Sequence, residues 1–201
     1  MFGFARVALA CLALLVLSQP QRADAQDTWE IDTAHSHVGF KIRHNMVSWV
    51  RGSFGRYEGR VEYTPGKPNS LRLDVTIDAK SIDTDNEKRD KHLRSPDFFN
   101  VEEFPKLTFK SKSLDCDAAG ACKVSGELTM HGVTRSVTLA VEPMSAPLTD
   151  PWGNVKIGTS ATTTLDRKDW GLTWNKTLDA GGLVVGDEVR LMIDVELVKR
   201  K

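Results

Sequence analysis

The sequence predicts an all-β protein, with an antiparallel sheet of eight strands and one short helix between two of them. Apolar and polar residues alternate with a period of two over much of the chain, which is typical of strands with one buried face. Clusters of Gly, Pro, Asn and Asp separate these runs, as turns require. The segment 88–105, KRDKHLRSPDFFNVEEFP, breaks the alternation with a charged run that ends in two phenylalanines, and there we expect the helix.

The first 25 residues are typical of a secretory signal peptide. Arg6 precedes an apolar run from 7 to 17, and Ala-Asp-Ala offers a cleavage site after Ala25. The run is shorter than the roughly 20 residues of a membrane-spanning helix, and no other stretch is a better candidate. Cys11 lies inside the run, so lipid modification there is the weaker alternative. We therefore expect an exported protein with one domain, residues 26–201, that does not span a membrane.

The charge balance argues against a nucleic-acid partner. The chain has 27 basic and 27 acidic residues, and removing Arg6, Arg22 and Asp24 with the signal leaves 25 basic and 26 acidic residues. Proteins that bind nucleic acids usually carry a marked excess of positive charge. We therefore expect no nucleic-acid partner.

Alternation locates each expected strand. In the run 38–44, Val38, Phe40, Ile42 and His44 share one face. Eight short strands must protect their edges, and closure into a barrel removes the edges altogether, although a sandwich is an alternative. The other expected strands are 71–79, Phe54 to Tyr63, Leu107 to Leu114, Lys123 to Met130, Arg135 to Val141, Val155 to Leu165, and Val189 to Val198.

The helix has a recognisable start. Thr84 and Glu87 fit a capping box, in which each side chain bonds the backbone of the other residue. Glu87 with Lys91 and Asp90 with Arg94 are spaced four apart with the acid first, which favours ion pairs along a helix.

The helix also has a recognisable end. Pro96 disfavours a helical residue before it, so the helix should stop at that point. So short a helix is unstable alone and must dock on the rest of the protein. We expect it to lie across one end of the sheet, with Phe98 and Phe99 inserted beneath it.

Two cysteines remain in the mature chain. Cys116 and Cys122 are separated by five residues, LDCDAAGACK, which leaves room for a hairpin between them. In an oxidising compartment such a pair favours a disulfide, with a metal pair or free thiols as alternatives.

Histidines provide a second functional hypothesis. His35 and His37 have a spacing used by some zinc sites, and His44, His92 or His131 could add a third ligand. A small exported metal-dependent enzyme is therefore the alternative function. The simpler interpretation is that these histidines cap turns or form hydrogen bonds in the core. The sequence has no G-x-S-x-G, P-loop or dinucleotide-binding motif, so we expect a protein that is not an enzyme, with no metal or cofactor.

The expected inward faces are mostly apolar. An eight-stranded barrel is wide enough either to be filled by side chains or to hold one ligand. Polar inward residues such as His44, Ser111 and Ser113 are few. The composition therefore favours an apolar ligand or none, and alternation alone leaves both open.

Five segments in order resemble the YceI-like family along the whole mature chain. They are IDTAHSHVGFKIRHNM, SIDT with KRDKHLRSPDFFNVEEFPKLTF, SGELTMHGVT, LDRKDWGLTW and VGDEVRLMIDVEL. The resemblance implies an eight-stranded antiparallel lipocalin-like barrel whose pocket holds a polyisoprenoid chain. It also implies a periplasmic protein, often a homodimer. We expect a non-catalytic carrier of an isoprenoid quinone or a polyprenyl phosphate.

The resemblance also implies which side chains face the lipid. The candidates for contact with a head group, with a purely structural role as the alternative, are Arg89, Asp90, His92, Arg167, Asp169 and Trp174. The expected ligand-binding residues are Phe40, Ile42, His44, Leu73, Val75, Ile77, Phe98, Phe99, Phe109, Leu128, Arg167, Trp174 and Ile193.

Overall fold

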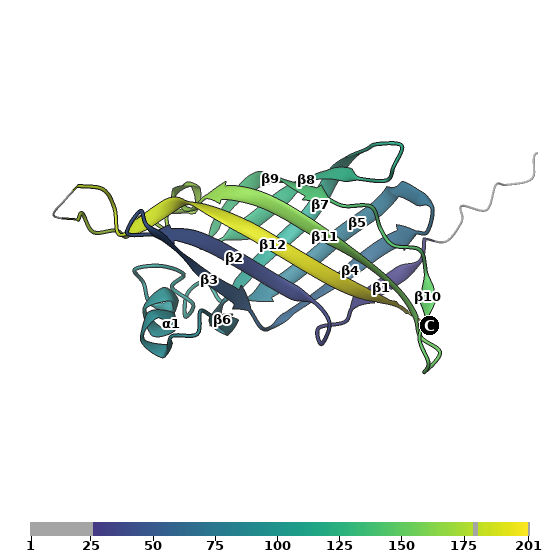
Figure 1. The fold of residues 1–201 in the computed structure, drawn as a ribbon, viewed down its shortest axis with the longest axis horizontal. Helices are drawn as coiled ribbons and strands as arrows, with labels where there is room; N and C mark the ends of the chain where they lie inside the picture. The colour runs from purple at the N-terminus through teal and green to yellow at the C-terminus, as the bar shows by residue number, and fades with distance from the viewer. Residues whose placement is uncertain (1–25, 179–180, 201) are drawn as a thin grey trace, which may run out of the picture.

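The computed structural model of the protein describes residues 26–178 and 181–200, which form a closed antiparallel β-barrel (Figure 1). The barrel confirms the predicted fold class and excludes the sandwich. The predicted signal peptide, residues 1–25, lies outside the described residues. No helix in the described part of the chain has the length and apolar character needed to cross a bilayer.

The barrel has eight strand positions, and two of them are each shared by two successive strands. One position holds β1 (Thr28–Ile31) and β2 (His37–His44), which both pair with β12. The next position holds β3 (Ser48–Phe54) and β4 (Tyr57–Thr64), which pair with β2 and β1. Pairing of β11 with β12 closes the ring. The other positions are β5 (Lys67–Asp78), β7 (Lys106–Cys116), β8 (Cys122–Met130), β9 (Val133–Val141), β11 (Val155–Asp166) and β12 (Val185–Lys199).

The sequence predicted the eight strand positions of the barrel correctly, but not all of the strands or their boundaries. The run expected as one strand from Phe54 to Tyr63 is divided at 55–56 between β3 and β4. No strand was predicted at β1 or over most of β3. Two short strands also extend the sheet, β6 (Ile82–Asp83) beside β3 and β10 (Leu148–Thr149) beside β11.

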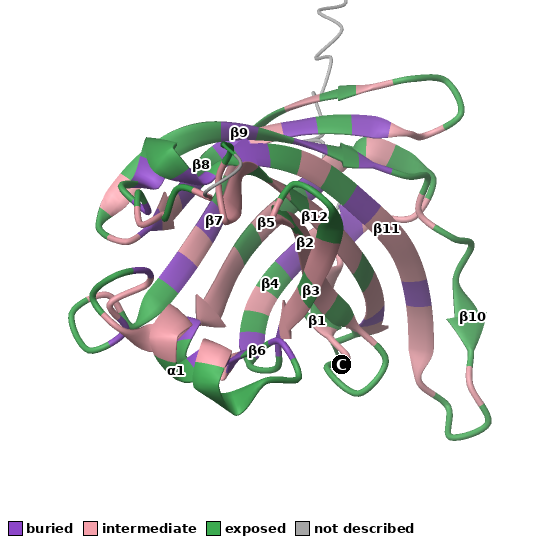
Figure 2. Ribbon diagram, turned by 60° about the vertical axis from the view of Figure 1, so that its left-hand side comes forward, coloured by how far each residue is buried: buried purple, intermediate pink, exposed green. Residues whose placement is uncertain are grey.

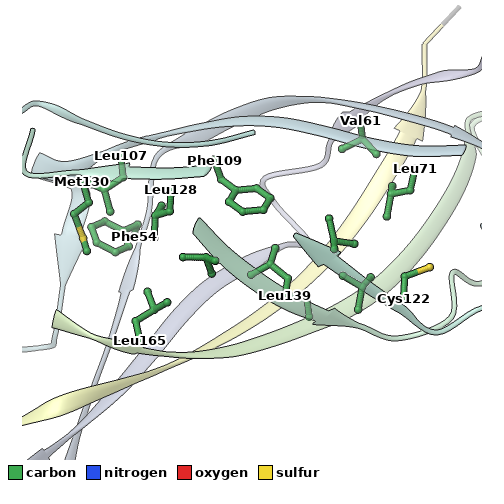
Figure 3. Close-up of a cluster of buried hydrophobic side chains, with 14 of the residues drawn as sticks. Phe54, Val61, Leu71, Leu107, Phe109, Cys122, Leu128, Met130, Leu139 and Leu165 are labelled. Carbon is green, nitrogen blue, oxygen red and sulfur yellow. The ribbon is translucent and has the colours of Figure 1, made fainter. Parts of the chain in front are cut away.

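Buried side chains alternate along the strands and point to the barrel interior. In β8 every second residue is buried, and Figure 2 shows the same banding on neighbouring strands. β11 is rich in Val, Ile and Thr, whose branched side chains suit a pleated strand. Figure 3 shows Phe54, Phe109, Leu139 and Leu165, from four strands, converging on the interior.

The helix α1 (Glu87–Arg94) lies at one end of the barrel and contacts β6 (Figure 1). The predicted capping box is wrong. Asn86 is the N-cap, and its side chain accepts a hydrogen bond from the Arg89 backbone N–H at 2.9 Å. Asn is among the strongest N-cap residues, so the structure uses the cap adjacent to the helix rather than Thr84.

The two ion pairs predicted along α1 are absent from the described contacts. Asp90 is buried and accepts hydrogen bonds from Thr84. Arg94 instead donates to the carbonyl oxygens of Lys80 and Ile82, at 2.8 and 2.5 Å. Both side chains therefore attach the helix to the barrel.

The predicted end of the helix is confirmed. Ser95 has an extended backbone immediately before Pro96, and its N–H bonds the His92 carbonyl. The chain then turns inward, so that Phe98 is buried and Phe99 packs against the core.

The predicted disulfide is present. Cys116 and Cys122 face each other at the end of the β7–β8 hairpin, with an S–S distance of 2.05 Å. The loop between them contains Gly120 with φ of 92°, a conformation that glycine adopts readily. The disulfide therefore closes a local hairpin, away from α1.

A thin seam of the barrel lies between β9 and β11. These strands share only the register pairs of Ala161 with Val141 and Thr162 with Ala140. Where they diverge, the short helix η2 (Arg167–Trp170) contacts β9. Trp170 is 2% exposed and donates a hydrogen bond to the Leu128 carbonyl at 3.2 Å.

Candidate functional site

The barrel interior contains a cavity of about 580 Å³. Inward-facing residues of the strands form most of its surface, together with α1 and the segments around 172–174 and 184–185. A core filled by side chains would leave no space of this size, since protein interiors are close-packed. The structure therefore supports the open pocket over the filled barrel.

Every residue expected to bind a ligand lies on this cavity. Their contact with a ligand stays a prediction. The residues are Phe40, Ile42 and His44 of β2, Leu73, Val75 and Ile77 of β5, Phe98 and Phe99 after α1, Phe109 of β7, Leu128 of β8, Arg167 of η2, Trp174 after η2, and Ile193 of β12.

Aromatic rings form two clusters on the cavity surface. Phe54 lies between Phe40 and Phe99, with ring centroids 5.9 and 5.8 Å apart. Trp174 contacts the His92 ring edge to face at 4.8 Å. These pairings connect β2, β3 and α1 with loops distant in sequence, so they fix the shape of this end of the cavity.

Two glycines make room for cavity phenylalanines. A Cβ atom on Gly52 would lie 2.5 Å from the Phe40 ring, and one on Gly126 would lie 2.6 Å from the Phe109 ring. Each ring therefore extends across a neighbouring strand where a side chain would stand. The absence of a side chain at these positions sets where the two rings lie.

The charged residues on the cavity surface are all basic. None of the described residues that line the cavity is an aspartate or a glutamate. The basic side chains lie at the ends of β2 and β11 and on α1, so they gather at the end of the barrel where α1 lies. They are Arg43, Lys88, Arg89 and Arg167, accompanied by His44 and His92.

Arg89 is oriented by hydrogen bonds to uncharged oxygens. Its Nε donates to the Thr84 hydroxyl at 2.7 Å, and an Nη donates to the Thr84 carbonyl at 2.6 Å. Thr84 in turn donates its backbone N–H and hydroxyl to Asp90. Among the described residues no carboxylate forms an ion pair with Arg89, so its positive charge is held in place without a direct counterion.

Arg167 is buried, and its charge is more fully neutralised than that of Arg89. It donates to the carbonyl oxygens of Gly186 and Leu172, and an Nη lies 3.2 Å from Asp187. Burial lowers the pKa of the Arg167 guanidinium from its usual value, and the Asp187 carboxylate opposes that shift. Lys168 shares the same carboxylate at 2.7 Å. Arg167 therefore mainly connects η2 to β12.

The remaining head-group candidates differ in position. His92 lines the cavity, and its Nε2 lies 2.7 Å from the Asp97 carboxylate. Asp90 and Asp169 do not line it. Asp90 holds Thr84, and the Asp169 backbone carbonyl accepts a hydrogen bond from Arg135. The structure gives these two residues local structural contacts only.

The histidines proposed as metal ligands do not gather. In the described part of the chain, the one group with ligand atoms close enough to hold a metal is Asp32, His35 and Glu196, without a second histidine. The Lys156 ammonium lies 3.2 Å from Asp32 and 2.6 Å from Glu196. An ammonium group already balances these carboxylates, so the cluster connects β11, β12 and the β1–β2 link.

Several residues that line the cavity were not predicted from the sequence. Val137, Leu139 and Val141 alternate along β9 in the same way as the residues of β2, so periodicity could have identified them. Arg43 alternates onto the outer face, yet it reaches the cavity rim because it lies near the end of β2. Lys88 carried no such signal, since only the docking of α1 brings it there.

A scan against family models matches the YceI-like domain to residues 29–197. Among curated relatives, a UPF0312 protein from Ectopseudomonas mendocina is 34% identical over 198 residues, which is 96% of this chain and 98% of the relative. These matches cover the barrel and the cavity residues described above.

Solved structures are similar along most of their length. The Campylobacter jejuni YceI protein is 33% identical, with a TM-score of 0.67 over 85% of this chain and 96% of that chain. A polyisoprenoid-binding domain from Saccharophagus degradans is 17% identical, with a TM-score of 0.63 over 87% and 99% of the two chains. The second likeness is one of fold.

Proposed function

The chain belongs to the YceI-like family, and we propose that it is a non-catalytic periplasmic carrier that holds an isoprenoid lipid inside its barrel. The observation that carries the proposal is the apolar cavity of about 580 Å³. Each CH₂ group removed from water contributes about 0.8 kcal/mol, so a long prenyl chain could bind tightly without specific polar contacts. The polyisoprenoid-binding domain that shares this fold supports the same class of ligand.

The charged end of the cavity favours a polyprenyl phosphate over an isoprenoid quinone. Arg89 and Lys88 line this end and have no ion pair with a described carboxylate. A phosphate would accept charge-assisted hydrogen bonds from the guanidinium, whereas a neutral quinone would leave that charge uncompensated. The lipid would then lie with its tail among the barrel residues and its head near α1.

Two features support the proposed compartment. The first 25 residues have the pattern of a signal peptide. Cys116 and Cys122 pair in the structure, and disulfides persist in oxidising compartments such as the periplasm.

The carrier proposal is tested by mass spectrometry of the native protein purified from cells, followed by organic extraction. We expect a bound mass that extracts as a prenyl lipid. Protein that is empty and does not bind added long-chain polyprenols or polyprenyl phosphates would overturn the proposal.

A matched pair of variants locates the lipid. Ala161 lines the cavity on β11, whereas Ala140 lies exposed on the neighbouring strand β9. Ala161→Phe should displace at least two CH₂ groups of the chain and weaken binding about tenfold or more. Ala140→Phe should bind as the wild type does. Equal binding by both variants would place the lipid outside the barrel.

The head-group preference is tested with a polyprenyl phosphate and a polyprenol of the same length. Wild-type protein should prefer the phosphate by about tenfold or more, because hydrogen bonds to charged groups contribute about 1.5–3 kcal/mol. Arg89→Gln should reduce the preference, and Arg60→Gln, which changes an exposed arginine of β4, should not. Equal affinity of wild-type protein for both lipids would refute an anionic head while leaving the carrier proposal intact.

A further inference from the structure

The hairpin of β2 and β3 differs in charge from the rest of this neutral chain. Between Asp32 and Glu58 the sequence has no acidic residue, and its basic residues are Lys41, Arg43, Arg51 and Arg56. Lys41, Arg43 and Arg51 lie on the two paired strands. The hairpin is therefore a local concentration of positive charge.

Like charges face one another across three strands of this surface. Lys41 of β2 is the direct register partner of both Arg190 of β12 and Arg51 of β3. Like charges directly opposite in a sheet are destabilising. Among these three, Arg190 alone forms an ion pair with a described carboxylate, Glu188 at 2.9 Å. Nothing in the described structure neutralises Lys41 and Arg51, so the fold keeps an arrangement that weakens the sheet.

The cations surround an aromatic ring on the outer face of the hairpin. Arg43 stacks over Trp49 at 4.2 Å, with Lys41 at 5.2 Å and Arg190 at 5.1 Å from the ring centroid. Tryptophan is enriched where proteins meet the boundary between water and lipid, because its ring is amphipathic. The group therefore has the chemistry of a membrane-water interface.

The turn of the hairpin adds apolar side chains that face solvent. Met46 is 60% exposed and Val47 is 80% exposed, whereas most large apolar residues of the described chain are covered. The neighbouring Asn45 donates its N–H to the Val184 carbonyl at 2.8 Å, which holds the turn in position. Figure 1 shows this turn at the end of the barrel where α1 lies.

We propose that the β2–β3 hairpin docks on the surface of an anionic phospholipid bilayer. Lys41, Arg43 and Arg51 would face the lipid phosphates, and Met46 and Val47 would enter the boundary of the acyl chains. An acidic protein surface would satisfy the cations but gives no reason for two apolar residues at the projecting turn. The combination of both features favours a bilayer.

Docking would also bring the charged end of the cavity to the bilayer. Arg43 and His44 belong to the same hairpin and line the cavity. A lipid could then pass between bilayer and barrel over a short distance. The inference itself rests on the hairpin and stands independently of the proposed cargo.

The proposal is tested by sedimentation of the purified protein with vesicles of phosphatidylcholine, with or without about one third phosphatidylglycerol. We expect binding to the anionic vesicles only, and weaker binding at higher salt. Because each Lys or Arg near an anionic surface changes affinity about fivefold, the double variant Lys41→Gln, Arg51→Gln should bind about 25-fold more weakly.

A matched variant controls for overall charge. Lys110→Gln with Lys112→Gln removes two exposed cations from β7, on another side of the barrel, and should leave vesicle binding unchanged. The hairpin variant should also keep or raise the melting temperature, since it removes like-charge repulsion, whereas loss of a structural contact would lower it.

The apolar turn has its own test. Met46→Asn with Val47→Ser should weaken vesicle binding about tenfold and keep its dependence on salt. Asn tolerates the positive φ of 62° at position 46, so the turn should persist. The proposal would be overturned if the wild-type protein did not bind anionic vesicles, or if the hairpin variants bound them as the wild type does. Binding of prenyl lipid in solution is a separate measurement, so neither result of the vesicle experiment decides the carrier proposal.

Discussion

At the scale of single residues, the charged end of the cavity depends on a hydrogen-bond relay. Thr84 accepts from Arg89 and donates to Asp90, and both Thr84 and Asp90 are buried. The Asp90 Oδ1 atom lies 3.0 Å from the Thr84 N and 2.5 Å from its hydroxyl. A buried carboxylate therefore fixes the threonine that orients the uncompensated arginine.

Asp90→Ala should lower the free energy of unfolding by about 2–3 kcal/mol, because it leaves buried donors of Thr84 unsatisfied. Urea denaturation measures this value. Glu87→Ala, on the exposed side of the same helix, should stay within about 0.5 kcal/mol of wild type. If Glu87→Ala lowered the free energy of unfolding strongly and Asp90→Ala lowered it little, the result would instead favour the capping box predicted from the sequence.

Asp32 makes part of the stability dependent on pH. Its hydrogen bond with His35, together with those from Lys156 and the Ala34 N–H, holds its pKa at about 2 against an ordinary value of 3.8, although burial acts in the opposite direction. The unfolded chain takes up a proton near pH 3.8, whereas the folded protein remains ionised until about pH 2. The stabilisation is therefore complete above about pH 4 and is lost as the pH falls through 2.

Asp32→Asn should be less stable than wild type by about 1–2 kcal/mol at pH 6, and the difference should shrink below pH 4. Chemical denaturation at pH 6, 4 and 2.5 measures it. Asp74→Asn, an exposed carboxylate 3.5 Å from Lys110, should differ little from wild type at pH 6 because surface ion pairs contribute little. A difference at Asp32 that does not change with pH would contradict the assigned cause.

At the scale of elements, a glycine in β3 leaves the space that a cavity phenylalanine of β2 occupies. Phe40 of β2 and Gly52 of β3 are direct register partners. A Cβ atom on Gly52 would also lie 2.6 Å from the Thr84 side chain and 2.9 Å from the Asp83 carbonyl. The β3 strand therefore cannot accept a side chain here without moving Phe40, and with it the surface of the cavity.

Gly52→Ala should destabilise the protein by about 1–3 kcal/mol, the usual effect of overpacking. Gly55→Ala is the matched control, because its nearest neighbour would be 3.9 Å away, and it should be neutral or slightly stabilising. Adding Phe40→Leu to Gly52→Ala should recover part of the loss. Equal effects at Gly52 and Gly55 would show that the close approach to Phe40 is not the cause.

At the scale of the whole molecule, closure of the barrel depends on a segment outside the strands. The β9–β11 seam has two register pairs, whereas β11 and β12 pair from Lys156 to Asp166. Trp170 bonds the Leu128 carbonyl, and its own carbonyl lies 3.0 Å from Nδ1 of His131. The tryptophan thus connects η2 to β8 across the seam, and a cavity behind an open seam would be exposed to water.

Trp170→Ala should lower the free energy of unfolding by about 3–5 kcal/mol, as expected for a buried aromatic residue. Trp152→Ala, which removes a tryptophan that is 82% exposed, should change it by less than about 0.5 kcal/mol. Thermal and urea denaturation monitored by circular dichroism compare the two variants. Similar losses for both would mean that Trp170 does not support the seam.

Much of the fold could be predicted because its signal is local. Period-two alternation identified all eight barrel positions and placed Phe40 and Ile77 on the interior face, whereas the family resemblance was needed to place Ile193 there. Pro96 predicted the end of α1 through its own geometry. The helix start was predicted wrongly because Thr84 and Asn86 both have side chains that can cap a helix. In the structure the Thr84 hydroxyl donates a hydrogen bond to the buried Asp90 side chain, and Asn86 is the N-cap.

The sequence by itself determined the eight barrel positions, the inward faces of β2 and β5, and the family, and it favoured the disulfide pair, since each depends on residues close in sequence or on motifs in order. Only the tertiary structure decided that the interior is open, that Lys88 and Arg89 meet Arg167 at one end of it, and that Lys41 faces Arg51 and Arg190 on the outer surface. These features depend on strand register and on how α1 docks. Both are set by packing between segments distant in sequence, and no local pattern encodes such packing.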